Sequence, residues 1–107
     1  MKVLIVEGKT DKEKLQNILA EPVKIICTFG TLSQTKLDEL ALLLEDEEVY
    51  ILTDADESGE KLRRQLKLYL PNATHLFTVR MYREVADSPA SFLAKILQEA
   101  HFLTHNV

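Results

Sequence analysis

Residues 49–62 read VYILTDADESGEKL, and this stretch decides the fold. Residues 49–53 form a short, mostly apolar run, which is typical of a strand buried within a sheet. Two aspartates, Asp54 and Asp56, follow at once, and Gly59 comes before a segment whose leucines recur at helical spacing. A strand, an acidic turn and a helix therefore follow one another, and two like charges meet where the strand ends.

The same alternation of strand and helix continues on both sides of this stretch. Short apolar runs predict further strands at residues 2–7, 23–29 and 74–79. Apolar stripes predict further helices at residues 10–20, 34–44 and 88–102. This order predicts right-handed crossovers, and hence one α/β domain over residues 1–107 with a parallel sheet of about four strands and helices on both faces.

Capping residues indicate where three of these helices begin. Thr10 and Glu13 have the spacing of a capping box. Ser33 can cap the second helix, and Ser88 followed by Pro89 suits an N-cap and a first helical position.

The composition limits the classes of function open to the chain. It has 107 residues, a formal net charge of −4 and one cysteine, so we expect a single domain without an internal disulfide. The acidic balance argues against binding nucleic acid through a wholly basic surface, which leaves local patches open. No stretch approaches the roughly 20 apolar residues of a membrane span, and the run after Met1 is too short for a signal peptide. We expect a cytoplasmic protein with no membrane partner.

Three carboxylates follow the first and third predicted strands. Glu7 ends the first strand, Asp54 ends the third, and Asp56 points to the same side as Asp54 by the two-residue period. Function collects beyond the carboxyl ends of parallel strands, so neighbouring strands would bring all three together. Like charges raise one another's pKa, and a divalent cation removes that penalty. The hard oxygen ligands indicate Mg²⁺, with Mn²⁺ as a substitute.

Two segments resemble the signature motifs of the Toprim family. The first is IVEGKTD at residues 5–11, and the second is LTDADESG at residues 52–59, which contains D-x-D-x-x-G intact. The TFGT stretch around Gly30 is similar to the segment after the second strand in several members. Toprim domains occur in bacterial primases, topoisomerases, recombination proteins and the ribonuclease that matures five-S ribosomal RNA. The resemblance covers about residues 2–80, with the helix at about 88–102 beyond it.

The resemblance implies a Rossmann-like fold and roles for the acids. Glu7 would act as general acid or base, or help to hold the metal, while Asp54 and Asp56 would bind Mg²⁺. The chemistry would make or break a phosphodiester bond, with the metal neutralising charge on phosphoryl oxygens. Asp87 resembles a further acidic residue downstream in primases.

Glycines and cations near the acids are candidates for binding a nucleic-acid backbone. Gly8 and Gly59 lack side chains, so a phosphate can approach the backbone, although each also suits a tight strand-to-helix turn. The basic residues that could contact phosphates follow the two motifs and the fourth strand: Lys9, Lys12, Lys61, Arg63, Arg64, Lys67, Arg80 and Arg83. Of these, Arg80 and Arg83 follow the fourth strand and are expected at the same edge of the sheet. A solvated helix face explains Arg63 and Lys67 at least as well as contact with phosphates.

Three functions remain open from the sequence. The first is a small Mg²⁺-dependent nuclease or nucleotidyl transferase acting on DNA or RNA. The second is a non-catalytic module that binds nucleic acid or a protein partner within a larger machine. A receiver-like signalling domain fits less well, because receivers place the acidic pair after the first strand, the reverse of this order. A homo-oligomer is also left open.

Overall fold

The four apolar runs form one parallel sheet. The computed structural model describes residues 1–78 and 84–106. The strands are β1 (Lys2–Val6), β2 (Lys24–Cys27), β3 (Glu48–Leu52) and β4 (Thr74–Leu76). They lie in the order β2-β1-β3-β4, and Ile5 of β1 is in register with Ile26 on one side and Ile51 on the other. The predicted α/β fold with four parallel strands is therefore confirmed.

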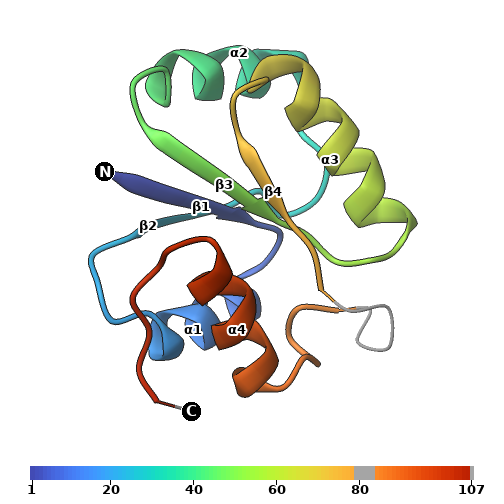
Figure 1. The fold of residues 1–107 in the computed structure, drawn as a ribbon. Coiled ribbons are helices and arrows are strands. Elements are labelled where there is room, and N and C mark those ends of the chain that lie inside the picture. The colour runs from blue at the N-terminus through green and yellow to red at the C-terminus, as the bar shows by residue number, and fades with distance from the viewer. Residues whose placement is uncertain (79–83, 107) are drawn as a thin grey trace.

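Two helices cover each face of the sheet. The helices are α1 (Lys9–Ile18), α2 (Gln34–Leu43), α3 (Glu57–Tyr69) and α4 (Ala90–Glu99). Figure 1 shows α1 and α4 side by side on one face and α2 and α3 on the other. None of the helices in the described residues is long and apolar enough to cross a membrane.

The alternation of side chains along β1 divides the apolar core between the two faces. Leu4 and Val6 point toward α1 and α4, whereas Val3 and Ile5 point toward α2 and α3. All four side chains are buried, because β1 is a central strand with a helical layer on each side. Glu7 is the next residue after this buried strand, so the strand fixes the position of the Glu7 backbone.

The first helix begins differently from the sequence prediction. It starts at Lys9, and Gly8 is its N-cap, so the predicted capping box of Thr10 and Glu13 is wrong. Asp11 takes that role, because its Oδ2 accepts a hydrogen bond of 3.0 Å from the Gly8 N–H. The Asp11 side chain therefore fixes the turn after Glu7.

The other two predicted caps had opposite outcomes. Ser33 caps α2 as predicted, since its Oγ accepts a hydrogen bond from the Lys36 N–H. Ser88 is not an N-cap: Pro89 holds that position, and the buried Ser88 hydroxyl donates instead to the Glu84 carbonyl at 3.0 Å. This bond closes a turn just before α4.

The segment after α4 returns to the start of the sheet. The Phe102 ring is buried and lies edge-on to Tyr50, with the ring centroids 4.7 Å apart. The Lys2 ammonium lies 4.7 Å from the centroid of the same ring and donates a hydrogen bond to the His101 carbonyl. The C-terminal segment thus completes the core on the α1 and α4 face.

Candidate functional site

Glu7 and Asp54 meet at the carboxyl edge of the sheet. They follow β1 and β3, which are paired in parallel. Glu7 Oε1 accepts a hydrogen bond of 2.7 Å from the Asp54 N–H. The condition that these two strands are neighbours is therefore met, and one bond joins the two motifs that the sequence singled out.

Asp56 lies at the start of α3, where it serves as the N-cap. Its Oδ1 accepts a hydrogen bond of 2.7 Å from the Gly59 N–H. Its charge also reaches the neighbouring acids. Burial raises the pKa of the Glu7 carboxyl, the bond from the Asp54 N–H opposes this, and the charges of Asp54, Asp56 and Asp11 raise that pKa further. We call Glu7, Asp54 and Asp56 the acidic centre.

A short segment before α4 contacts the acidic centre through one backbone hydrogen bond. The Val85 side chain is fully buried in the core, and its N–H donates a hydrogen bond of 2.7 Å to Asp54 Oδ1. Burial raises the pKa of the Asp54 carboxyl, and the charges of Asp56 and Asp87 add to this rise. The charge of Asp87 therefore acts on the acidic centre. The charges of the acidic centre also act on Glu84. The pKa of its carboxyl is raised, and the charge of Asp87 is the largest cause.

Sequence reasoning missed two acids, Asp11 and Glu84. Asp11 is buried, and burial together with the charge of Asp54 raises the pKa of its carboxyl. The spacing of Asp11 three residues after Gly8 is a capping pattern that could have revealed it. Glu84 carried no such signal, because its position depends on the turn that the Ser88 hydroxyl closes.

The acidic centre has the donor set of a magnesium site. One oxygen of each carboxylate is held by a backbone N–H, while the other accepts no hydrogen bond from the described residues. In residues 1–78 and 84–106, no three metal-binding side chains already converge on one point. Mg²⁺ does not require this, because it commonly takes one or two carboxylates and keeps several waters. The residues present therefore fit a hydrated Mg²⁺ ion.

The two glycines have different surroundings. A Cβ at Gly59 would lie 2.1 Å from the Asp54 carbonyl oxygen and 3.0 Å from Glu7 Oε1, so α3 packs directly on the acidic centre. At Gly8 the nearest atom to such a Cβ is Asp11 Oδ2 at 3.6 Å, which is an ordinary contact. Both N–H groups already donate to carboxylates of the chain. The close approach at Gly59 accounts for a glycine there without a ligand.

The candidate cations are placed less uniformly than the acids. Lys9 begins α1 beside the acidic centre, and its side chain is 80% exposed, with Glu13 Oε1 4.0 Å away. Lys61 is exposed near the start of α3. Arg80 and Arg83 lie outside the described residues.

Arg63 contradicts the prediction of a solvated helix face. Its side chain is only 2% exposed, and its guanidinium donates hydrogen bonds of 2.9 Å to His75 Nδ1 and to the Leu76 carbonyl. It also lies 4.2 Å from the centroid of the Phe77 ring. Arg63 is buried because it joins α3 to β4 at the sheet edge, whereas Lys67 is exposed as predicted.

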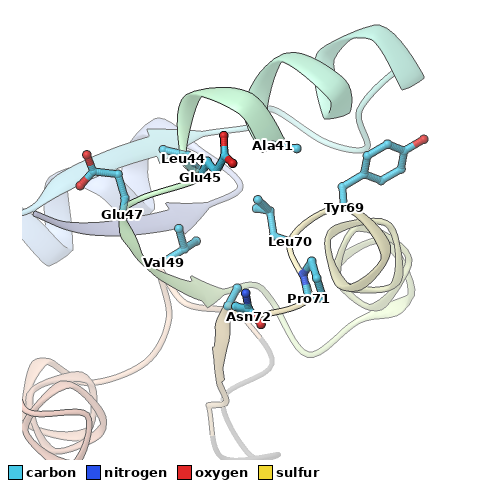
Figure 2. Close-up of a pocket in the computed structure, with 10 residues that line it drawn as sticks. Ala41, Leu44, Glu45, Glu47, Val49, Tyr69, Leu70, Pro71 and Asn72 are labelled. Atoms are coloured by element: carbon cyan, nitrogen blue, oxygen red, sulfur yellow. The ribbon is translucent and has the colours of Figure 1, made fainter.

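A cavity of about 170 Å³ lies at the other end of the sheet. Figure 2 shows that residues from the end of α2, the start of β3 and the end of α3 surround it, among them Leu44, Val49 and Leu70. None of the predicted site residues lines this cavity. The acidic centre, not this cavity, is therefore the candidate functional site.

Comparison with known families agrees with this geometry. The family model described as the Toprim domain matches residues 2–83. The chain belongs to the Toprim family. Toprim domains generally bind Mg²⁺, which matches the donor set of the acidic centre.

Relatives with and without a named activity share this Toprim domain. The chain is 55% identical to "Uncharacterized protein YusF" of Bacillus subtilis, over 99% of this chain and 73% of that protein. It is 29% identical to ribonuclease M5 of Mycoplasma pneumoniae over 95% of this chain, and 38% identical to ribonuclease M5 of Mycoplasma mycoides over 65%. It spans only 61% and 40% of those two ribonucleases.

A solved structure has the same fold. It is a small TOPRIM domain protein from Bacillus stearothermophilus, 53% identical, with a TM-score of 0.94. The match covers 97% of this chain and 88% of the other.

Proposed function

We propose that this Toprim domain performs Mg²⁺-dependent phosphodiester chemistry on nucleic acid, as a nuclease or a nucleotidyl transferase. The observation that carries the proposal is the hydrogen bond from the Asp54 N–H to Glu7 Oε1. It joins the two Toprim motifs at the carboxyl edge of the sheet and holds Glu7 beside two further carboxylates.

Asp54 and Asp56 would hold the metal, with Glu7 close to it. Mg²⁺ bound there supplies neutralisation of the charge that develops on phosphoryl oxygens. The backbone bonds from Val85 and Gly59 orient the two aspartates, because each fixes one carboxylate oxygen and leaves the other directed elsewhere. The chain thus presents ligands that need little rearrangement when the ion binds.

Glu7 would transfer the proton. Burial and the neighbouring acids raise the pKa of its carboxyl above that of an ordinary glutamate, so it holds a proton more readily than a solvated side chain does. A general acid or base works best when its pKa approaches the working pH. Its bond to the Asp54 N–H also fixes the direction of the carboxyl group.

RNA is the substrate class that the relatives favour. The two relatives from Mycoplasma bear the name ribonuclease M5, and the match to one of them covers 95% of this chain. The net charge of −4 predicts that the domain alone binds RNA weakly and that salt weakens this binding steeply. An extended contact surface on a partner or a second copy would strengthen the binding.

The same negative net charge favours a second candidate, a non-catalytic Toprim module that docks on a larger nucleic-acid machine. In that case the acidic centre would bind Mg²⁺ without cleavage. The two candidates differ in one observable, the appearance of cut products.

A cleavage assay tests the proposal. The protein is incubated with labelled single- or double-stranded RNA or DNA, in Mg²⁺, Mn²⁺ or EDTA. We expect slow cleavage or transfer with a divalent ion, none in EDTA, and none by the variant carrying both Asp54→Asn and Asp56→Asn. Equal cleavage by this double variant would contradict the assignment of the acidic centre. If no substrate reacts in either metal, the binding-module proposal takes the place of the enzyme.

A further inference from the structure

An exposed aromatic residue has its backbone hydrogen-bonded to Glu7, the residue of the acidic centre that follows β1. Phe29 follows β2, and its side chain is 76% exposed. Its N–H donates a hydrogen bond of 2.7 Å to the Glu7 carbonyl oxygen, and the Thr28 N–H donates to the Val6 carbonyl. These two bonds continue the pairing of β1 and β2 past the strand ends, so the Phe29 backbone is fixed next to Glu7.

The backbone of Phe29 has a conformation that a bulky residue rarely adopts. Its φ angle is +55°, in the left-handed region, and Gly30 follows at +104°. Asparagine or glycine would tolerate this conformation better than phenylalanine. A strained residue held by its surroundings, with its ring in solvent rather than in the core, indicates that the ring serves a purpose other than folding.

The space beside the ring has the size and charge for part of a nucleic-acid chain. A cavity of about 510 Å³ is lined by Phe29, Cys27, Lys9, Lys12, Glu13 and Gln16. This volume lies within the range of ligand sites, ~300–1,000 Å³. Its two lysines and one glutamate make it locally positive in a chain whose net charge is −4.

One of the two lysines that line this cavity, Lys9, has only a weak partner within the described residues. Lys9 Nζ lies 4.0 Å from Glu13 Oε1, and both side chains are mostly exposed. Exposed ion pairs of this kind contribute little to the stability of a protein. A phosphate that arrives near Lys9 therefore competes with a weak partner only.

We propose that Phe29 is a stacking platform for an unpaired base, with Lys9 and Lys12 contacting the phosphates on either side of that base. The inference rests on the proposed function, since it names the class of substrate: single-stranded nucleic acid, or a single-stranded region of a folded RNA. Base stacking on an aromatic ring tolerates all sequences, because every base has a flat face. A base inside a regular duplex is already stacked and does not reach the ring.

The position next to Glu7 gives the platform a role in the reaction. Phe29 and Glu7 are linked through the backbone bond, so a base stacked on the ring places an adjacent phosphodiester toward the acidic centre. Phe29 then selects where the strand is cut and whether a paired strand is accepted. It is a specificity-determining residue, and the acids perform the chemistry.

Fluorescence anisotropy with labelled single-stranded RNA, single-stranded DNA and duplex RNA tests the platform. EDTA in a low-salt buffer prevents cleavage during the measurement. We expect Phe29→Asn to weaken binding of both single strands about tenfold, with little effect on the duplex. Asparagine suits the left-handed backbone, so this variant is expected to fold at least as stably as the wild type.

Two further variants serve as controls. Phe29→Tyr keeps an aromatic face and should bind like the wild type. Leu68→Ala removes another exposed apolar side chain, 81% exposed on α3, and should also leave binding unchanged.

Lys9→Ala with Lys12→Ala should weaken binding and flatten its salt dependence.

Wild-type affinity in Phe29→Asn would overturn the platform, as would equal losses for single strands and duplex. Absence of single-strand binding by the wild type at low salt would overturn it too. None of these results decides the proposed function, because that is judged separately, by cleavage in Mg²⁺ and its loss in the aspartate variants. A preference between the RNA and DNA arms identifies the source of the strand.

Discussion

Replacing Gly59 with alanine would add a methyl group where α3 touches the end of β3. The new Cβ would lie 2.1 Å from the Asp54 carbonyl oxygen and 2.9 Å from the Asp54 carbonyl carbon. Carbon contacts are normally about 3.5 Å or longer, so the two backbones would have to separate by about 1.4 Å. The atoms in the way are backbone atoms, which cannot rotate aside as a flexible side chain can.

The change in the free energy of unfolding caused by Gly59→Ala is the sum of opposing contributions. Overpacking of this kind costs about 1–3 kcal/mol. The separation would also disturb the bonds that Asp54 makes with Glu7 and Val85, at about 1 kcal/mol each. The higher helix propensity of alanine returns at most about 1 kcal/mol. We expect Gly59→Ala to lower the free energy of unfolding by about 3 kcal/mol, or Tm by about 12 °C for a domain of this size.

Urea unfolding followed by circular dichroism measures this change. Ser58→Ala, one residue earlier in α3 and exposed, is the matched control and should stay within about 0.5 kcal/mol of the wild type. A loss for Gly59→Ala no larger than that of the control would refute the reasoning. It would mean that α3 can move away from the acidic centre freely, which the hydrogen bonds argue against.

Three further changes have expected outcomes of their own. Asp54→Asn keeps an oxygen that can accept the Val85 N–H and removes one of several like charges, so it should raise Tm in EDTA in a thermal-shift assay. Asp54→Ala loses that acceptor and should lower Tm. A lower Tm for both variants would mark Asp54 as a structural anchor alone. The pKa values of Glu7 and Asp54 are raised on folding, so the folded domain binds more protons than the unfolded chain above their ordinary values of 4.5 and 3.8. The free energy of unfolding in EDTA should therefore fall as the pH rises from about 4 through the raised pKa values, and fall less in Asp54→Asn; equal slopes in urea titrations would contradict this. Arg63→Ala should lower the free energy of unfolding by about 3 kcal/mol without rescue by Arg63→Lys, because an ammonium does not reproduce the planar guanidinium that bonds the Leu76 carbonyl; full rescue by lysine in urea unfolding would show that charge alone matters.

The fold and the heart of the site could be predicted because both depend on short-range patterns. The apolar runs and the strand-helix alternation determine a parallel sheet, and the ends of neighbouring parallel strands meet by geometry alone. Glu7 and Asp54 therefore came together without any knowledge of tertiary packing. The D-x-D-x-x-G spacing likewise placed Asp56 at the start of α3 and Gly59 in its first turn.

The remaining features depend on contacts between distant segments, which the local sequence does not contain. Arg63 has the spacing of a solvated helix face, and only the position of β4 beside α3 buries it. The approach of Glu84 to the acidic centre requires Val85 to insert into the core 31 residues after Asp54. Ser88 had a good capping sequence, but a nearby carbonyl offered its hydroxyl another partner.

Asp54 and Asp56 each accept a backbone hydrogen bond that supports the fold. Asp56 caps α3, and Asp54 holds the segment around Val85, so an alanine at either position removes a fold contact together with a metal ligand. A lost cap alone costs about 1 kcal/mol. Asparagine keeps the acceptor in both places, and it is therefore the substitution that separates function from folding.

The most direct test of the central claim is the rate at which Glu7→Gln cleaves labelled RNA in Mg²⁺, compared with the wild type. Glutamine keeps an oxygen that can accept the Asp54 N–H, so the fold and the Mg²⁺-induced rise in Tm should persist. The variant cannot transfer a proton, and its cleavage rate should fall by about 100-fold or more. A variant that binds Mg²⁺ and cleaves as fast as the wild type would contradict the assignment of Glu7, and with it the proposed chemistry of the acidic centre.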